Sequence, residues 1–488
     1  MSNSMDAKQE AALRWRRTKI IATLGPASST AEMIEKLINA GANAFRINMS
    51  HGEHEDYRQQ VKLVREIAQR CHQHIAIIMD LCGPKIRVGK FENEQIELND
   101  SDDVTVTCRD IIGKPGLIPS QYLDLHQDIK PGERILLDDG NLELKAKDVE
   151  GLDIHCQVVH GGTLKNKKGM NLPDSSLSTR SFTEKDQHDA KLAIELEADF
   201  VALSFVRSHE DVLRLKYFLE QHDADMGIIS KIEKPEAVSD IEAILEHSYA
   251  IMVARGDLGI EVPAEQVPLI QQRLIQQARQ YNRPVIVATQ MLESMIQNSR
   301  PTRAEVGDVA NAAFSSADVV MLSGETAAGK YPLSAVETMD RILREIEAHQ
   351  WQQNSFGDNN TQTEKNSEIM PVREAVACAA LDLAHNLKLQ GILIPTGSGT
   401  TARVISSSRP SAPCIGVCAD ARVNRRLALS WGVVPTLIDE PDTHNWRQMC
   451  ETINQQVELT QAGHTILLVS GFNDDPARNE PVMKILTI

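Results

Sequence analysis

Short apolar runs recur from residue 18 to residue 323, and most are separated by segments with the spacing of amphipathic helices. The runs are rich in Val, Ile and Ala and nearly continuous, which is typical of strands buried on both faces of a parallel sheet. Eight strands are predicted, at residues 18–25, 43–50, 74–81, 199–206, 226–233, 250–258, 284–290 and 317–323. Eight strand–helix units favour an α/β fold of the (β/α)8 TIM-barrel type over a doubly wound sheet, which rarely needs so many repeats.

The interval between the third and fourth strands is too long for a connection within a barrel. It contains segments in which apolar and polar residues alternate around turn signals such as Asp139–Gly140, a pattern typical of antiparallel strands. We therefore predict a small β-barrel at residues 84–179, inserted into a TIM barrel that comprises residues 18–83 and 180–349.

A polar stretch at residues 351–368 follows the barrel and is predicted to be a linker. Beyond it, helical segments alternate with apolar runs such as 391–395, 412–418 and 465–470. This alternation predicts a C-terminal α/β domain at residues 365–488. Residues 1–17 are expected to form an N-terminal segment outside the barrel.

Composition narrows the class of protein. The 488-residue chain has a formal net charge of −17, which disfavours a nucleic-acid partner or a basic membrane-surface protein. Its apolar runs are too short for a membrane span and its polar start is unlike a signal peptide, so we expect a cytoplasmic protein with no membrane partner. Metal-like spacings occur at Cys71–His72–His74 and Cys414–Cys418. Because structural zinc needs four clustered ligands, we favour reduced thiols there.

Polar side chains gather where the predicted barrel strands end. Arg46, Asn48 and Ser50 alternate at the end of the second strand and therefore share one face, and Asp80 ends the third strand. The other candidates at strand ends are His51, Lys231, Glu233, Asp257, Thr289, Gln290, Ser323 and Glu325. Because the carboxyl ends of barrel strands meet at one mouth, we predict that these groups form a single site.

The residue types indicate the chemistry of that site. Two carboxylates, Glu233 and Asp257, suit a hard divalent cation such as Mg²⁺, while Lys231 and neighbouring arginines face an anionic substrate. The backbone N–H groups around Gly256 suit a phosphate or carboxylate. This combination predicts phosphoryl transfer or enolate stabilisation. The alternatives are a solvated Lys231–Glu233 pair, a helix-capping Asp257 and a core-lining Thr289.

The segments that carry these residues resemble those of the pyruvate kinase family. "TKIIATLGPAS", "RINMSHG", "IISKIE", "IMVARGDLG", "VATQMLESM" and "MLSGETAAGKYP" occur in the order of the family, and the resemblance runs from Thr18 to the C-terminus. It implies transfer of a phosphoryl group from phosphoenolpyruvate to ADP, giving pyruvate and ATP in the last step of glycolysis. It also implies Mg²⁺ (or Mn²⁺), a homotetramer, a lid formed by the inserted domain and a regulatory C-terminal domain.

The resemblance assigns roles to individual positions. Lys231 matches the lysine that stabilises the transferred phosphoryl group and the enolate oxygen. Thr289 matches a threonine near the protonated face of the enolpyruvate. The remaining assignments are Arg46, Gly256 and Asp257 as substrate contacts, Glu233 and Asp257 as Mg²⁺ ligands, and His51, Arg87 and Lys185 as nucleotide contacts.

Two positions depart from the family at the site of its monovalent cation. By resemblance, K⁺ is held by oxygens at Asn48, Ser50, Asp80 and residue 81, with threonine common at 81 and glutamate at the position of Lys85. This chain has Leu81 and Lys85 instead. We therefore expect that K⁺ is not required, because the Lys85 ammonium group supplies the charge. The alternative is a solvated lysine at the lid hinge.

A glycine-rich turn in the C-terminal domain predicts an effector site. Thr396, Ser398, Gly399, Thr400 and Thr401 lie between a strand and a helix and align with the family's sugar-phosphate loop. Because Asp474 and Asp475 should repel a second phosphate, we expect either a monophosphate effector, such as a sugar monophosphate or AMP, or no response at all. An ordinary capped turn is the alternative.

Two other functions fit parts of the pattern. A Mg²⁺-dependent lyase acting on phosphoenolpyruvate or pyruvate needs neither the lid nor the nucleotide contacts Arg87 and Lys185. A non-catalytic metabolite sensor needs no intact set of Lys231, Glu233 and Asp257. Formation of ATP separates the first from a kinase, and turnover separates the second.

Overall fold

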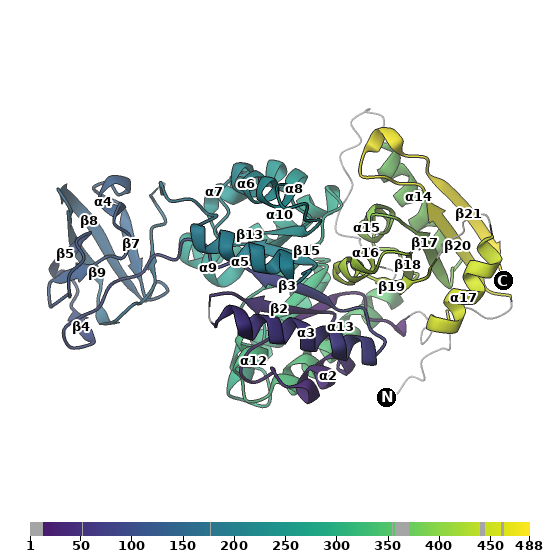
Figure 1. Cartoon of the computed structure of the whole chain (residues 1–488), viewed down its shortest axis with the longest axis horizontal. Helices are drawn as coiled ribbons and strands as arrows, with labels where there is room; N and C mark the ends of the chain where they lie inside the picture. The colour runs from purple at the N-terminus through teal and green to yellow at the C-terminus, as the bar shows by residue number, and fades with distance from the viewer. Residues whose placement is uncertain are drawn as a thin grey trace.

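The computed structural model describes residues 13–50, 52–175, 177–353, 355–356, 370–439, 445–459 and 463–488. The inserted domain, the barrel and the C-terminal domain lie in a row, with the barrel in the middle (Figure 1). His51, residues 1–12 of the N-terminal segment and most of the predicted linker at 351–368 lie outside the described residues. Among the described residues, no helix is both long and apolar enough to span a bilayer.

The central body is a closed barrel of eight parallel strands, as predicted. Its strands are β1 (Lys19–Thr23), β2 (Ala44–Asn48), β3 (Ala76–Asp80), β12 (Phe200–Leu203), β13 (Gly227–Ile232), β14 (Ala250–Ala254), β15 (Val285–Ala288) and β16 (Val319–Leu322). The hydrogen-bonded order is β1-β16-β15-β14-β13-β12-β3-β2. Each strand lies inside its predicted range, because double-sided burial makes the apolar runs easy to recognise.

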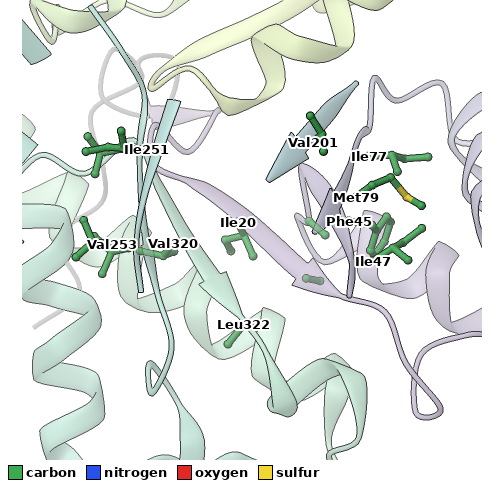
Figure 2. Close-up of a cluster of buried hydrophobic side chains, with 14 of the residues drawn as sticks. Ile20, Phe45, Ile47, Ile77, Met79, Val201, Ile251, Val253, Val320 and Leu322 are labelled. Atoms are coloured by element: carbon green, nitrogen blue, oxygen red, sulfur yellow. The ribbon is translucent and has the colours of Figure 1, made fainter. Parts of the chain in front are cut away.

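Alternate residues of these strands form two buried layers. Ile21, Ile78 and Phe200 belong to a cluster composed mainly of strand residues, which fills the interior of the barrel. Their neighbours, including Ile20, Ile77 and Val201, pack outward against the helices, and Figure 2 shows several side chains of this outer layer. The period of two along each strand therefore determines which polar residues point into the mouth.

Helices surround the barrel: α2 (Ala31–Asn39), α3 (His54–Arg70), α5 (Glu184–Glu195), α6 (His209–Glu220), α7 (Pro235–Ser239), α8 (Ile241–His247), α9 (Arg255–Glu261), α10 (Val267–Gln280), α11 (Arg303–Phe314), α12 (Gly324–Ala327) and α13 (Pro332–Gln353). Several begin at a hydroxyl cap. Thr30 accepts a hydrogen bond from Met33 N, and Thr183 and Thr302 each form a reciprocal capping box. These caps satisfy N–H groups that otherwise have no partner within the helix.

The inserted domain has its own core, which includes Val106, Ile135 and Leu144. Its elements are β4 (Gln95–Leu98), β5 (Asp103–Thr107), β6 (Leu117–Pro119), α4 (Leu125–Asp128), β7 (Arg134–Leu137), β8 (Leu142–Glu150), β9 (Asp153–His160), β10 (Gly162–Lys165) and β11 (Met170–Asn171). They form a six-stranded and a two-stranded sheet, an open arrangement where the sequence predicted a small β-barrel, and β5 and β6 run parallel. The predicted turn at Asp139–Gly140 joins β7 to β8.

The C-terminal domain is a five-stranded sheet in the order β19-β18-β17-β20-β21 with helices around it. Its elements are α14 (Val372–Asn386), β17 (Gly391–Pro395), α15 (Thr400–Ser407), β18 (Cys414–Cys418), α16 (Ala421–Arg426), β19 (Val433–Leu437), α17 (Trp446–Val457), β20 (Thr465–Ser470) and β21 (Val482–Thr487). The two edge strands, β19 and β21, were not predicted.

This domain docks on the amino ends of the barrel strands. Arg409 pairs with Asp318 at 3.0 Å, and Arg425 pairs with Asp199 at 2.7 Å; both carboxylates come just before barrel strands. Leu429, with Ala428, joins the same buried cluster as the interior residues of the barrel. The barrel and the C-terminal domain therefore share a core at this end.

A buried lysine in this interface predicts a pH dependence. Lys19 Nζ donates to Val433 O at 2.6 Å, and burial, reinforced by the charge of Arg16, lowers the pKa of Lys19 to about 7. An unfolded lysine titrates near 10.4, so the unfolded chain binds more protons between these values and stability rises with pH across them. Lys19→Met should gain stability relative to wild type at pH 6, and more than half of that gain should be lost by pH 9.

Thermal unfolding at pH 6, 7.5 and 9 measures the effect, with Lys62→Met as the control because Lys62 is exposed. A Lys19→Met difference from wild type that is the same at all three pH values contradicts the prediction.

Candidate active site

Four of the predicted residues converge at the carboxyl ends of β2, β3 and β13. Arg46, Asp80 and Lys231 follow interior residues at a spacing of two, and Glu233 continues the alternation beyond Ile232. Asn48 is the register partner of Asp80 across β2 and β3. The alternation inferred from the sequence therefore places these side chains in one mouth.

The four charged groups form one buried cluster. Lys231 Nζ lies 2.9 Å from Glu233 Oε1 and 3.4 Å from Asp80 Oδ1, and Arg46 Nε lies 2.5 Å from Asp80 Oδ2. The side chains of Asp80 and Glu233 are 1% exposed and that of Lys231 is 11% exposed. The alternative of a solvated Lys231–Glu233 pair is therefore wrong.

The protonation states follow from these contacts. Burial alone would lower the pKa of Lys231, but the carboxylates of Asp80 and Glu233 outweigh it and raise this pKa, so the ammonium group stays charged. Burial opposes ionisation of Asp80, yet Lys231 and Arg46 hold its pKa below the usual range. Burial raises the pKa of Glu233, and the nearby Asp257 carboxylate adds to the increase. A second cation beside Glu233 and Asp257 would relieve this repulsion.

The fourth strand contributes groups that the sequence analysis missed. Lys231 Nζ donates to Ser204 Oγ at 2.7 Å, and Ser204 Oγ donates to Leu81 O at 2.7 Å. Phe205 N donates to Glu233 Oε2 at 2.7 Å. Ser204 directly follows the apolar strand β12 and lies two residues after the interior residue Ala202. This alternation could have identified Ser204 from the sequence.

The amino end of α9, which directly follows β14, faces the turn after β15. Gly256 N donates to Thr289 Oγ1 at 2.7 Å, and Thr289 Oγ1 donates to Ala288 O at 2.6 Å. Thr289 has a φ of 67°, which is rare for a β-branched residue and is typical of strain held at a functional site. Thr289 is partly exposed rather than core-lining, so its hydroxyl is fixed at the mouth.

The carboxylates of Glu233 and Asp257 fit a divalent cation. The side chain of Asp257 makes no hydrogen bond or ion pair to any described residue, and no side-chain cap is formed at the start of α9. The helix-capping alternative is therefore not observed. Two neighbouring carboxylates, one without a partner in the described part of the chain, match the small protein ligand set that Mg²⁺ takes beside substrate oxygens.

Three residues of the predicted monovalent-cation pocket, Asn48, Ser50 and Asp80, lie close together at the ends of β2 and β3. Asn48 Oδ1 accepts from Ser50 N at 3.1 Å, and the Leu81 carbonyl accepts from Ser204, as described above. Lys85 does not join this set: it is exposed, and among the described residues its side chain pairs with no carboxylate. It lines a cavity of about 60 Å³ between the inserted domain and the barrel, which Asp257 also lines.

The nucleotide candidates are spread over two elements. Arg87 Nη1 donates to Lys167 O within the inserted domain at 2.8 Å. Lys185 Nζ donates to Met49 O at 2.8 Å and to Asp189 at 2.5 Å, which places it beside the end of β2. His51, the third candidate, lies outside the described residues.

The glycine-rich turn of the C-terminal domain borders a larger cavity. Gly399, with a φ of 83°, donates from its N–H to Thr396 Oγ1 at 3.0 Å, while Thr401 Oγ1 donates to Phe472 O at 3.4 Å. Thr400 donates to Asp474. The cavity of about 740 Å³ lies between this domain and the barrel, and its lining includes Ser398, Thr400, Arg283, Arg373, Arg403 and Arg426.

Neither cysteine spacing belongs to a group of three or more clustered candidate ligands in the described part of the chain. All eight cysteines are free, and the one group of three or more clustered candidate ligands found there is His209, Glu210 and Asp240. His209 Nδ1 lies 2.8 Å from Asp240 Oδ2 at the surface.

Both the sequence and the fold are similar to known proteins. The sequence matches the family models "Pyruvate kinase, barrel domain" over residues 15–336 and "Pyruvate kinase, alpha/beta domain" over residues 374–486. The pyruvate kinase of Geobacillus stearothermophilus is 45% identical over 479 residues, which cover 97% of this chain and 80% of the relative. That of Clostridium perfringens is 38% identical, covering 96% and 99%. The crystal structure of a pyruvate kinase from Cryptosporidium parvum superposes with a TM-score of 0.89 at 32% identity, covering 99% and 100%.

Proposed function

Because the chain belongs to the pyruvate kinase family and is a phosphotransferase of that class, we propose that it transfers the phosphoryl group of phosphoenolpyruvate to ADP in a Mg²⁺-dependent reaction. The products are pyruvate and ATP. The observation that supports this best is the buried Lys231–Glu233–Asp80 cluster, with the carboxylate of Asp257 beside it at the mouth of the barrel.

The charged residues hold the phosphoryl group. Arg46 and Lys231 supply two fixed cations, and Asp80 orients both because it pairs with each of them. Glu233 and Asp257 would hold Mg²⁺ (or Mn²⁺), which when bound neutralises charge on the phosphoryl and carboxylate oxygens. Since the charged groups of Arg46 and Lys231 are in place before substrate arrives, they stabilise the charge that develops in the transition state without reorganisation.

The remaining substrate contacts come from the turns after β14 and β15. The hydroxyl of Thr289 is held between the Gly256 N–H group and the Ala288 carbonyl, so its position relative to the enolate is fixed. We assign Thr289 to the protonation of the enolpyruvate carbon. The inserted domain acts as a lid that excludes water, and Arg87, Lys185 and His51 contact the nucleotide.

A steady-state assay with phosphoenolpyruvate, ADP and Mg²⁺ tests the proposal, with pyruvate and ATP measured separately. ATP formation that requires the divalent cation supports it. Release of pyruvate without ATP favours the lyase, and substrate binding without turnover favours the sensor. Chelation by EDTA should abolish activity, and added Mg²⁺ should restore it.

We also propose that the enzyme needs no K⁺. Three of the oxygens that resemble the family's K⁺ ligands already accept a hydrogen bond: Asp80 Oδ2 from Arg46, Asn48 Oδ1 from the Ser50 N–H group, and the Leu81 carbonyl from Ser204. The other oxygen of Asp80 forms an ion pair with Lys231 at 3.4 Å. Lys85 adds a further positive charge in the cavity that Asp257 lines. Both features reduce the need for an added monovalent cation.

For the C-terminal domain we propose an effector with one phosphate group. The turn at Thr396–Thr401 supplies hydroxyl and N–H groups, and Arg373 and Arg403 line the adjoining cavity. Asp474 accepts a hydrogen bond from Thr400 and lies 3.3 Å from Arg403. Its carboxylate therefore neutralises part of the charge of Arg403 and would repel a second phosphate group.

A sugar monophosphate or AMP is therefore expected to lower the KM for phosphoenolpyruvate, and Arg373→Gln should reduce this response by about tenfold, as for loss of one charged contact. The measurement is KM with and without each effector. Arg422→Gln, at an exposed arginine that does not line the cavity, serves as the control. Strong activation by fructose-1,6-bisphosphate alone would contradict the assignment.

By analogy with the family we propose a homotetramer located in the cytoplasm. The edge strand β21 leaves Val482 and Ile485 exposed, and an unpaired apolar edge favours association with another chain. Light scattering coupled to gel filtration measures the assembly.

A further inference from the structure

One carboxylate joins the inserted domain to the barrel behind the candidate metal ligands. Glu261 ends α9, and its Oε1 accepts from Lys234 Nζ at 2.7 Å and from Asn171 Nδ2 at 2.9 Å. Lys234 directly follows Glu233, and Asn171 lies on β11 of the inserted domain. Glu261 therefore connects three segments that are far apart in the sequence.

The contacts of Glu261 with Lys234 and Asn171 are poorly suited to serve only the stability of the fold. The side chains of Lys234 and Glu261 are 8% and 2% exposed, and a buried ion pair loses much of its attraction to desolvation. Glu261 Oε2 is also buried and has no hydrogen-bond partner among the described residues. An acceptor left in this state costs free energy, so the carboxylate retains capacity for one more donor.

These contacts are also close to the groups that carry the chemistry. Asp257 and Glu261 are four residues apart on α9 and therefore lie on one face of the helix. Lys234, the partner of Glu261, directly follows the other candidate ligand, Glu233, in the chain. A shift of Glu261 would thus be transmitted to Asp257 through one turn of α9. It would be transmitted to Glu233 through Lys234 and the peptide unit that joins the two.

The inserted domain rests on the same end of α9. A Cβ atom at Gly140, in the turn between β7 and β8, would lie 3.7 Å from Ile260 Cγ2. Asp139 and Asn171 line the small cavity together with Lys234 and Asp257. The carboxyl end of α9 therefore contacts the inserted domain, while its amino end carries Gly256 and Asp257.

We propose that Glu261 is a positioning residue that couples the position of the lid to the two metal-binding carboxylates. The Asn171–Glu261 hydrogen bond holds the inserted domain against the carboxyl end of α9. The second carboxylate oxygen of Glu261 accepts a hydrogen bond from an additional donor when the lid closes. This role rests on the proposed function, because closure over substrates is what the coupling serves.

Reversal of hydrogen-bond polarity provides the test. Asn171→Asp keeps the size of the side chain but places a carboxylate against Glu261, so the lid should be released. We expect the KM for ADP and the Mg²⁺ concentration for half-maximal rate to rise about 3- to 10-fold, as for loss of one charge-assisted hydrogen bond. Adding Glu261→Gln should restore both values, because the amide introduced at position 261 donates to the carboxylate introduced at position 171.

Hydrogen exchange of the lid and α9 is measured on the same proteins. Asn171→Asp should accelerate exchange at β11 and the β7–β8 turn, and the double variant should return it to the wild-type rate. Glu265→Gln, at an exposed position just after α9, and Asn99→Ala, in the lid away from the barrel, are the matched controls and should leave exchange and KM unchanged.

The outcomes separate this inference from the proposed function. If wild type forms no ATP, the proposed function fails, while the exchange data still test the contact. If wild type is active but Asn171→Asp keeps its KM values and exchange rates, the coupling is wrong. Equal loss in Asn171→Asp and in the double variant also overturns it, since a mere packing role predicts no rescue.

Discussion

Replacing Lys231 with Met is expected to lower kcat at least ~10²-fold while changing the KM for phosphoenolpyruvate little. The ammonium group lies between Asp80 and Glu233 and donates to Ser204, so its position is fixed before substrate binds. In the proposed reaction, its interaction with the substrate would strengthen as charge develops on the enolate oxygen. Loss of such a contact affects the transition state more than the ground state.

The same substitution leaves two buried carboxylates with less compensation, so a fall in stability must be separated from a fall in rate. Circular dichroism and thermal unfolding show whether the variant is folded at the assay temperature. Lys231→Arg retains the charge and should be less destabilising but still impaired, because a guanidinium group does not fit the site of an ammonium group. A folded Lys231→Met enzyme with wild-type kcat would refute the role.

The wild-type enzyme should work at nearly full rate in buffer free of Na⁺ and K⁺, with tetramethylammonium holding the ionic strength. Lys85→Glu, alone or with Leu81→Thr, should create a K⁺ requirement of ~10²-fold in rate, by restoring the charge deficit that a bound ion fills. Lys85 is exposed and lines the cavity beside Asp257, so its reversal alters charge at the mouth without disturbing a core.

Lys90→Glu is the matched control, because it makes the same charge change at an exposed lid position. It should not create a K⁺ requirement. The single Lys85→Glu variant is the cleaner test, since Leu81 is buried and its replacement carries a cost in stability. A ~10²-fold rise in wild-type activity on adding K⁺ would show that Lys85 does not replace the ion.

The sequence predicted the barrel and its polar mouth because both depend on local pattern. The double-sided burial of strands such as β3 and β13 makes continuous apolar runs, and alternation then places Asp80 and Lys231 on the inner face. The edge strands β19 and β21 lack this signal: β19 contains Pro435, and β21 alternates only partly, with one neighbour.

Contacts made by tertiary folding were not predictable. Ser204 acquires its role only because β12 lies between β3 and β13, which brings it to Lys231 and Leu81. The grouping of Lys85 with Asp80 was implied only by the family resemblance. Gly83, with a φ of 66°, turns the chain between them, so Lys85 leaves the inner face of the barrel and enters the hinge.

The barrel is incomplete without another part of the chain. Leu429 and Ala428 close its interior at the amino ends of the strands, and Lys19 and Asp318 contribute to the same junction. Removal of the C-terminal domain would expose to water the apolar interior residues at the amino ends of the barrel strands. The two domains are therefore expected to unfold as a single cooperative unit, and a molecule bound in the cavity between them would lie against the amino ends of barrel strands.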